Sequence, residues 1–173
     1  MKKQGISENL ANQVYLAIGS NLGNKINNIE KTKFELGKYK IMILKSSSNY
    51  VSESWPDKSM PNYINIILKV KTSLLPIQLL KICNLIELKL GRIRSKKNAP
   101  RKCDIDIIDY NKKVFIEKNN QLILPHPRMN KRNFVLLPLF EVNKSWKHPK
   151  SGINIVNLIN SLPVKDLRSI KQI

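Results

Sequence analysis

The 173-residue chain has few cysteines and no long apolar run, and each shortage excludes a class of protein. Two cysteines, Cys83 and Cys103, are too few for a disulfide-rich secreted scaffold and fit no zinc-ligand spacing. We therefore expect two free thiols in a reducing cytoplasm. Apolar runs such as INIILKV at 64–70 are far too short to cross a bilayer. The lysines of residues 1–13 are followed by no apolar stretch, which argues against a secretory signal.

Two common nucleotide-binding motifs are also missing from the sequence. There is no G-x-x-x-x-G-K-[ST] segment and no G-x-G-x-x-G segment between a strand and a helix. The segment GSNLGNK at 19–25 is weak evidence for phosphate binding, and we interpret it as a tight turn followed by a helix cap.

Acidic residues are scarce: 12 stand against 31 basic ones, which gives a formal charge of +19. Such a charge normally indicates nucleic-acid binding. Only six of the basic residues are arginines, however, and isoleucine and asparagine are abundant, as an AT-rich genome would impose on any protein. The lysines are also scattered along the chain. Compositional drift is the favoured explanation, and an anionic small-molecule substrate or a nucleic-acid surface are the alternatives.

The order of apolar patterns predicts one α+β domain over 14–173, preceded by a solvated arm over 1–13. Strands are expected at 14–20, 40–54, 63–73 and 103–110. One helix should start at a cap on Asn24 and stop at Gly37, and another should start near Pro76 and stop at Gly91. This β-α-β-β-α-β order is typical of a ferredoxin-like core with a mostly antiparallel sheet and helices on one face. A β-ribbon over 112–129 and short C-terminal helices should follow it.

The strand CDIDIIDY carries two acids one pleat apart. Side chains at i and i+2 of a strand share a face, so Asp104 and Asp106 should point together while Ile105 and Ile107 point into the core. Two carboxylates this close repel each other, and a divalent cation removes the repulsion. Mg²⁺ prefers one or two carboxylates together with substrate phosphates. The pair therefore predicts half of a metal site, although an isolated D-x-D more often lies on an exposed face and pairs with lysines.

The neighbouring arginines favour the metal hypothesis. Arg92, Arg94 and Arg101 account for half of all the arginines in a chain that otherwise uses lysine. Arginine makes bidentate phosphate contacts that lysine cannot copy, and metal with arginines is common equipment for phosphoryl transfer. A second cluster, at 124–141, contains His126, Arg128, Arg132 and Phe134, although His126 alone could be a turn residue bonded to backbone.

Four segments together resemble the 6-hydroxymethyl-7,8-dihydropterin pyrophosphokinase family. They are AIGSNLGNK at 17–25, IELKLGRIR at 86–94, PRKCDIDII at 100–108 and LPHPRMNKRNFVLLPLFE at 124–141. The resemblance covers roughly residues 14–145. The first segment alone is weak, whereas the acidic strand with its preceding Pro-Arg and the later His-Pro…Arg-x-Phe segment are specific.

The resemblance implies an enzyme of folate biosynthesis. Such an enzyme transfers diphosphate from ATP to 6-hydroxymethyl-7,8-dihydropterin by attack at the β-phosphorus and releases AMP. Two Mg²⁺ ions would bind between the triphosphate and Asp104 and Asp106. The expected protein is a cytoplasmic monomer with no membrane or specific nucleic-acid partner.

Site residues follow from the resemblance, position by position. Arg92 and Arg101 would bind phosphates and serve catalysis with the two aspartates. The ATP side would also include Glu87, Arg94, His126 and Arg132. The pterin would lie between the rings of Tyr63 and Phe134, with Asn65 on its polar edge and the segment from Ser52 to Trp55 beside it.

The chain departs from the family pattern in two loops. Residues 52–62 contain no glycine, and Asn98 and Ala99 precede Pro100 where relatives often carry an aromatic residue. Neither change touches the expected metal or phosphate residues, so we expect activity to persist.

Two other functions stay open. A basic RNA- or ribosome-binding module on the same scaffold would explain the charge, but it predicts exposed aromatics on the sheet and leaves the two aspartates unexplained. Another metal-dependent nucleotidyl or phosphoryl transferase would differ in its products.

Overall fold

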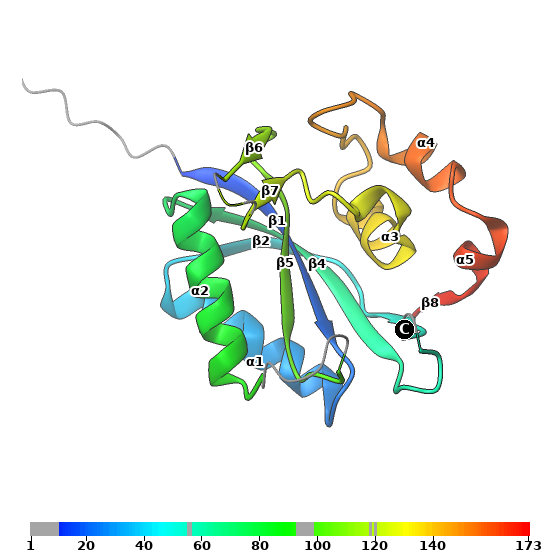
Figure 1. Cartoon of the computed structure of the whole chain (residues 1–173), viewed down its shortest axis with the longest axis horizontal. Coiled ribbons are helices and arrows are strands. Elements are labelled where there is room, and N and C mark those ends of the chain that lie inside the picture. The colour runs from blue at the N-terminus through cyan, green and yellow to red at the C-terminus, as the bar shows by residue number, and fades with distance from the viewer. Residues whose placement is uncertain (1–10, 55–56, 93–98, 118, 120) are drawn as a thin grey trace, which may run out of the picture.

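The structure is a computed structural model that describes residues 11–54, 57–92, 99–117, 119 and 121–173. Its centre is a six-stranded sheet, with α1 and α2 on one face and α3 on the other (Figure 1). Within these residues no helix is both long and apolar enough to cross a membrane.

Every pairing in the sheet is antiparallel. The strand order is β5-β1-β4-β3-β8, and β2 also pairs with β4, beside β3. The expected mixed α/β fold with a mostly antiparallel sheet is therefore confirmed. The first strand begins two residues earlier than predicted, and residues 1–10 of the expected arm lie outside the described residues. The strands are β1 (Asn12–Ser20), β2 (Met42–Ser46), β3 (Tyr50–Ser52), β4 (Tyr63–Thr72), β5 (Asp104–Tyr110) and β8 (Ile170–Gln172).

Helices α1 (Lys25–Lys38) and α2 (Pro76–Lys89) cover one face of the sheet (Figure 1). One side of α2 is buried against the sheet, with Leu79, Cys83 and Ile86 at most 1% exposed. They pack with alternate strand residues, among them Ile105 and Ile107 of β5, which confirms the predicted orientation of the acidic strand. Both cysteines are buried free thiols, as expected.

The opposite face is covered by α3 (Asn133–Val142) and the segment that follows it. Its core contains Tyr15, Ile67, Ile108 and the fully buried Trp146. The prediction placed helices on one face only, so this second layer is an addition to it. The remaining elements are β6 (Phe115–Ile116) paired with β7 (Ile123–Leu124), a 3₁₀ turn η1 (Met129–Lys131), α4 (Ile155–Asn160) and α5 (Val164–Arg168).

The single strand expected over 40–54 is divided into β2 and β3. Between them, Ser47 bonds Ile67 of β4 twice, through its backbone N–H (2.9 Å) and through its hydroxyl, which accepts from the Ile67 N–H (2.9 Å). The next residue, Ser48, donates its N–H and its hydroxyl to the carboxylate of Glu141 at the end of α3. These side-chain bonds replace the regular ladder and bend the chain.

The end of α1 corrects a second prediction. Gly37 was expected to stop the helix, but α1 continues to Lys38, and Lys40 takes the left-handed conformation with φ +57°. The Lys40 N–H bonds the Gly37 carbonyl (3.1 Å) and the Ile41 N–H bonds the Leu36 carbonyl (3.3 Å). The apolar contact between Leu36 and Ile41 places the turn, because both residues belong to the core.

Glycine at position 40 and alanine at position 37 should each stabilise the protein. A lysine at φ +57° costs about 1 kcal/mol relative to glycine, and a glycine inside a helix costs about 0.5–1 kcal/mol relative to alanine. A Cβ at Gly37 would meet nothing within 4 Å. We therefore expect Lys40→Gly and Gly37→Ala each to raise the urea midpoint. A lowered urea midpoint for Gly37→Ala would indicate that Gly37 ends the helix, as the sequence predicts.

Candidate active site

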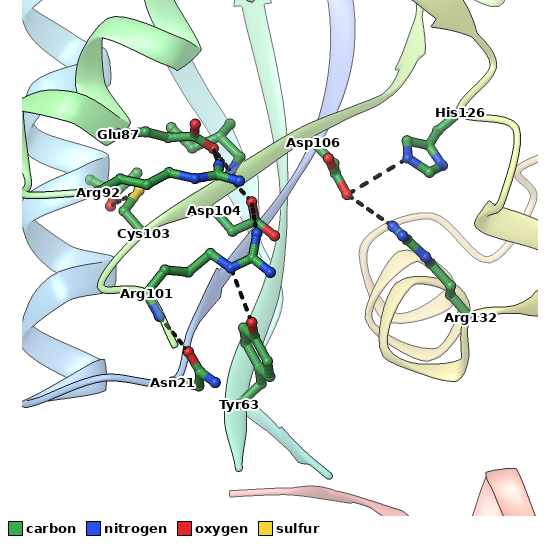
Figure 2. Close-up of polar contacts among 12 residues, drawn as sticks. Asn21, Tyr63, Glu87, Arg92, Arg101, Cys103, Asp104, Asp106, His126 and Arg132 are labelled. Carbon is green, nitrogen blue, oxygen red and sulfur yellow. Dashed lines mark hydrogen bonds and ion pairs between the residues drawn. The ribbon is translucent and has the colours of Figure 1, made fainter. Parts of the chain in front are cut away.

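The predicted acids lie on the α3 face of the sheet, beyond the part that α3 covers (Figure 2). Strand β5 pairs with β1, so that Asp104 is opposite Gly19 and Asp106 is opposite Ala17. On its other side Gly19 is opposite Asn65 of β4. A Cβ on Gly19 would come within 3.2 Å of the Asn65 Oδ1, so glycine allows β4 and β5, on either side of β1, to present polar groups close together.

Asp104 receives two arginines. Its Oδ1 lies 2.8 Å from the Nη1 of Arg92 and 3.3 Å from the Nη1 of Arg101 (Figure 2). Burial raises the pKa of the Asp104 carboxyl, and the negative charge of Asp106 raises it further, while the two arginines oppose both effects. The carboxylate therefore needs cations around it to stay charged.

Asp106 has a separate set of partners. Its Oδ2 accepts a hydrogen bond from the Nη1 of Arg132 (2.9 Å), and the Nε2 of His126 is 3.7 Å away (Figure 2). Burial lowers the pKa of His126, which Asp106 partly offsets. The two predicted basic clusters thus meet at the acidic strand, one on each acid.

The position of Arg92 follows from the way α2 ends. Gly91 has φ +87°, and its N–H bonds the Leu88 carbonyl (2.9 Å) while the Arg92 N–H bonds the Glu87 carbonyl (2.9 Å). This pair of bonds defines a Schellman turn, for which glycine is the preferred residue. The turn returns Arg92 toward Glu87, and their side chains form an ion pair.

Glu87 connects helix α2 to the acidic strand. Its side chain is 3% exposed, and its Oε1 accepts the backbone N–H of Ile105 (2.8 Å) as well as pairing with Arg92. Burial raises the pKa of Glu87, and these two contacts oppose the rise. Glu87 therefore fixes both the strand between the two aspartates and the arginine above it. Its predicted role on the ATP side stays a prediction.

The residues predicted for the pterin lie beside this centre. The hydroxyl of Tyr63 accepts from the Nε of Arg101 (3.2 Å), and the Nδ2 of Asn65 donates to the hydroxyl of Ser52 (2.9 Å). Phe134 is the second residue of α3, and the guanidinium of Arg132 lies 5.5 Å from its ring centre. Strands β3 and β4 and the start of α3 thus bring four of the five predicted pterin residues to this face. The fifth, Trp55, lies outside the described residues, as does Arg94.

The oxygen donors of the site fit a magnesium ion whose remaining ligands come from a substrate. Asp104 and Asp106 are both oxygen donors on one strand face. In the described part of the chain, no group of three or more His, Cys, Asp or Glu could hold a metal alone. Two carboxylates without a full protein cage are what Mg²⁺ uses when phosphates supply its other ligands.

Comparison with known families agrees with this arrangement. The family model described as 7,8-dihydro-6-hydroxymethylpterin-pyrophosphokinase (HPPK) matches residues 15–144. The chain belongs to the HPPK family. A 2-amino-4-hydroxy-6-hydroxymethyldihydropteridine pyrophosphokinase of Aquifex aeolicus is 39% identical over 136 residues, which cover 79% of this chain and 83% of that protein.

Other relatives and structural neighbours are much longer than this chain, which spans less than half of their length. The folic acid synthesis protein fol1 of Pneumocystis carinii is 37% identical over 157 residues, which are 91% of this chain but only 21% of the relative. The fold is similar to that of an HPPK-DHPS crystal structure with substrates, at a TM-score of 0.73 and 16% identity over 94% of this chain and 46% of that one. A wild-type Plasmodium falciparum HPPK-DHPS has a TM-score of 0.69 at 16% identity, over 96% of this chain and 45% of its own.

One residue that the sequence did not single out, Asn21, contacts the candidate site. The turn GSNLGNK does hold a helix cap, since the Asn24 side chain accepts from the Asn27 N–H (3.0 Å), and Gly23 has φ +65°. But Asn21, in the same turn, is 1% exposed and bonds the backbone of Arg101 (Figure 2). The segment around Asn21 is a weak signal by itself, and its contact with Arg101, 80 residues away, cannot be seen in the sequence.

Proposed function

We propose that this chain is an ATP-dependent diphosphotransferase acting on 6-hydroxymethyl-7,8-dihydropterin in folate biosynthesis. The observation that carries the proposal is the acidic pair of β5 with arginines on both sides: Arg92 and Arg101 at Asp104, and Arg132 at Asp106. Membership of the HPPK family supplies the substrate class.

In the proposed reaction, the hydroxymethyl oxygen of the pterin forms a bond to the β-phosphorus of ATP. The bond from that phosphorus to the oxygen of the α-phosphate breaks, its electron pair leaves with AMP, and the hydroxymethyl proton is released. Two Mg²⁺ ions held by Asp104 and Asp106 would stabilise charge on the attacking and leaving oxygens. Arg92 and Arg101 would bind and orient the transferred phosphates, with Arg132, His126, Glu87 and Arg94 on the ATP side.

The present ion pairs fit a change of partners on substrate binding. Each aspartate is neutralised by arginine, so the arginines are already within reach of any phosphate that approaches the acids. With a metal bound at its carboxylate partner, each guanidinium would be free to contact a phosphate oxygen. The charges would then stay balanced, which avoids the cost of leaving a buried charge alone.

The pterin would occupy the neighbouring part of the sheet, between Tyr63 and Phe134. Asn65, held by Ser52, offers both a donor and an acceptor to a heterocycle. The bond from Arg101 to Tyr63 joins this subsite to the phosphate subsite. A monomeric state and a cytoplasmic location remain predictions.

We also propose a ferredoxin-like description of the core. If β2 and β3 are taken as one interrupted strand, the chain runs β-α-β-β-α-β from β1 to β5, and the sheet order places β1 and β4 in the centre. The β6–β7 pair then forms the ribbon that precedes the C-terminal helices.

A direct assay tests the proposed reaction. The protein is incubated with ATP, Mg²⁺ and hydroxymethyl-dihydropterin, and AMP and pterin diphosphate are measured. We expect both products in equal amounts and none in EDTA. ADP instead of AMP would indicate a different phosphoryl transfer. Nanomolar sequence-selective RNA binding at 0.15 M salt would favour the nucleic-acid alternative.

Removing the Phe134 ring should separate the two substrates. We expect Phe134→Ala to weaken pterin binding by about 1–3 kcal/mol, by analogy with base stacking on aromatic rings, and to change ATP binding much less. Calorimetry with each ligand alone measures both. Phe140→Ala, in the same helix and against the same core cluster, is the matched control and should affect neither. Equal losses for both ligands would assign Phe134 to the core.

A further inference from the structure

Asn21 lies where three segments that are distant from one another in sequence come together. It follows β1, and it is 1% exposed although its side chain is a carboxamide. Its backbone N–H and both polar atoms of its side chain are bonded to two other loops. One of these loops carries Arg101, and the other connects β3 to β4.

Two hydrogen bonds link Asn21 to Arg101. The Asn21 N–H donates to the Arg101 carbonyl (3.0 Å), and the Asn21 Oδ1 accepts from the Arg101 N–H (2.7 Å). Both backbone groups of the arginine are thereby fixed by a single residue. The guanidinium of the same arginine reaches Asp104 and Tyr63, so the Asn21 contact determines where that side chain starts.

The other side of the carboxamide serves the loop that follows the pterin strand β3. The Asn21 Nδ2 donates to the hydroxyl of Ser54 (3.3 Å) and to the carbonyl of Pro61 (3.3 Å). Ser54 also donates to the Pro61 carbonyl (2.6 Å), so the three groups form a closed set. Ser54 lies two residues beyond Ser52, which holds Asn65.

We propose that Asn21 is a positioning residue that couples the pterin subsite to the phosphate subsite. The oxygen of one carboxamide fixes the backbone of Arg101, and its nitrogen fixes the loop beyond Ser52. A displacement on either side therefore changes the hydrogen-bond geometry on the other. The inference rests on the proposed function for the identity of the two substrates. The structural coupling between the two loops does not depend on that function.

The two ends of the carboxamide can be tested separately. Asn21→Asp keeps an oxygen for the Arg101 N–H and removes the donor to Ser54 and Pro61. Asn21→Ala removes both contacts. A misplacement of about 1 Å can reduce turnover roughly 100-fold. We expect Asn21→Ala to lower kcat by about this factor, and Asn21→Asp to raise KM for the pterin with a much smaller change in kcat.

Amide hydrogen exchange supplies a readout that does not depend on activity. In Asn21→Ala the Arg101 amide should exchange at least about 10-fold faster while the amides of β1 and β4 keep their protection, which marks a local opening. In Asn21→Asp the Arg101 amide should stay protected. Asn143→Ala is the matched control, because Asn143 also donates from a side-chain amide, to Tyr15 (2.8 Å), at a different part of the fold. It should leave kcat and the Arg101 amide unchanged.

Several outcomes would overturn the coupling. An Arg101 amide that stays protected in Asn21→Ala would do so, as would faster exchange over the whole sheet with normal kcat in the folded fraction. If Asn21→Ala does not fold, Asn21→Asp still decides, since an unchanged pterin KM contradicts the proposal. An inactive wild-type chain would instead count against the proposed function, and the exchange experiment would still judge the coupling.

Discussion

Asp104→Ala and Asp106→Ala should each reduce diphosphate transfer roughly 1,000-fold while the protein stays folded. Loss of one carboxylate removes part of the metal binding, and metal ions contribute several kcal/mol to the stabilisation of such transition states. A loss of about 4 kcal/mol corresponds to that factor in rate. The measurement is steady-state AMP formation as a function of Mg²⁺ concentration, with folding checked by urea titration.

Asp109→Asn provides the control on the same strand. Asp109 is 1% exposed, and it accepts hydrogen bonds from the Trp146 indole (2.8 Å) and the Lys112 N–H (2.9 Å). An amide there sets an N–H against a donor, so we expect about 1–3 kcal/mol less stability and an unchanged kcat. Full activity of the Asp104 or Asp106 variant would refute the site assignment.

Arg92 should have two separable roles, one in catalysis and one in stability. Arg92→Ala leaves the buried Glu87 without its cation, which we expect to cost about 3–5 kcal/mol of stability. It should also lower kcat roughly 100- to 1,000-fold, because one preorganised charged donor commonly contributes that much. Arg92→Lys should keep most of the stability but still lose much of kcat, since lysine cannot contact Asp104 and Glu87 with one planar group.

The double variant Glu87→Gln with Arg92→Ala separates the two roles. It removes both charges and keeps an acceptor for the Ile105 N–H, so stability should largely return while kcat stays low. Glu87→Gln alone reports any direct effect on ATP binding. Arg168→Ala, which changes an exposed arginine in α5, should alter nothing. Recovery of kcat in the double variant would mean that Arg92 acts only by neutralising Glu87.

The parts of the site that could be predicted are those encoded by short spacings. The alternation of Asp104 and Asp106 with two isoleucines determines which face each side chain takes, because a strand has a period of two. Gly91 after an apolar helical stripe predicts the turn that places Arg92, because glycine accepts positive φ without strain.

The parts that could not be predicted depend on partners distant in sequence. The break between β2 and β3 requires Glu141, 93 residues from Ser48. The contact that places Arg101 requires Asn21, 80 residues away. The glycine at position 37 predicts that α1 ends there. The burial of Leu36 and Ile41 instead places the left-handed turn at Lys40. Long-range hydrogen bonds leave no periodic signature in the residues that make them.

The pairing of β8 with β3 has a consequence for synthesis of the chain on the ribosome. Ser52 is opposite Ile170 in that pairing, so the outer edge of β3 gains its partner only when translation has passed residue 170. Synthesis from Ser52 to Ile170, at about 5–20 residues per second, takes roughly 6–24 s. Unpaired strand edges are templates for association with other chains. Throughout that interval the nascent protein exposes such an edge next to the residues proposed for the pterin, and a chaperone that binds extended segments would find its target there.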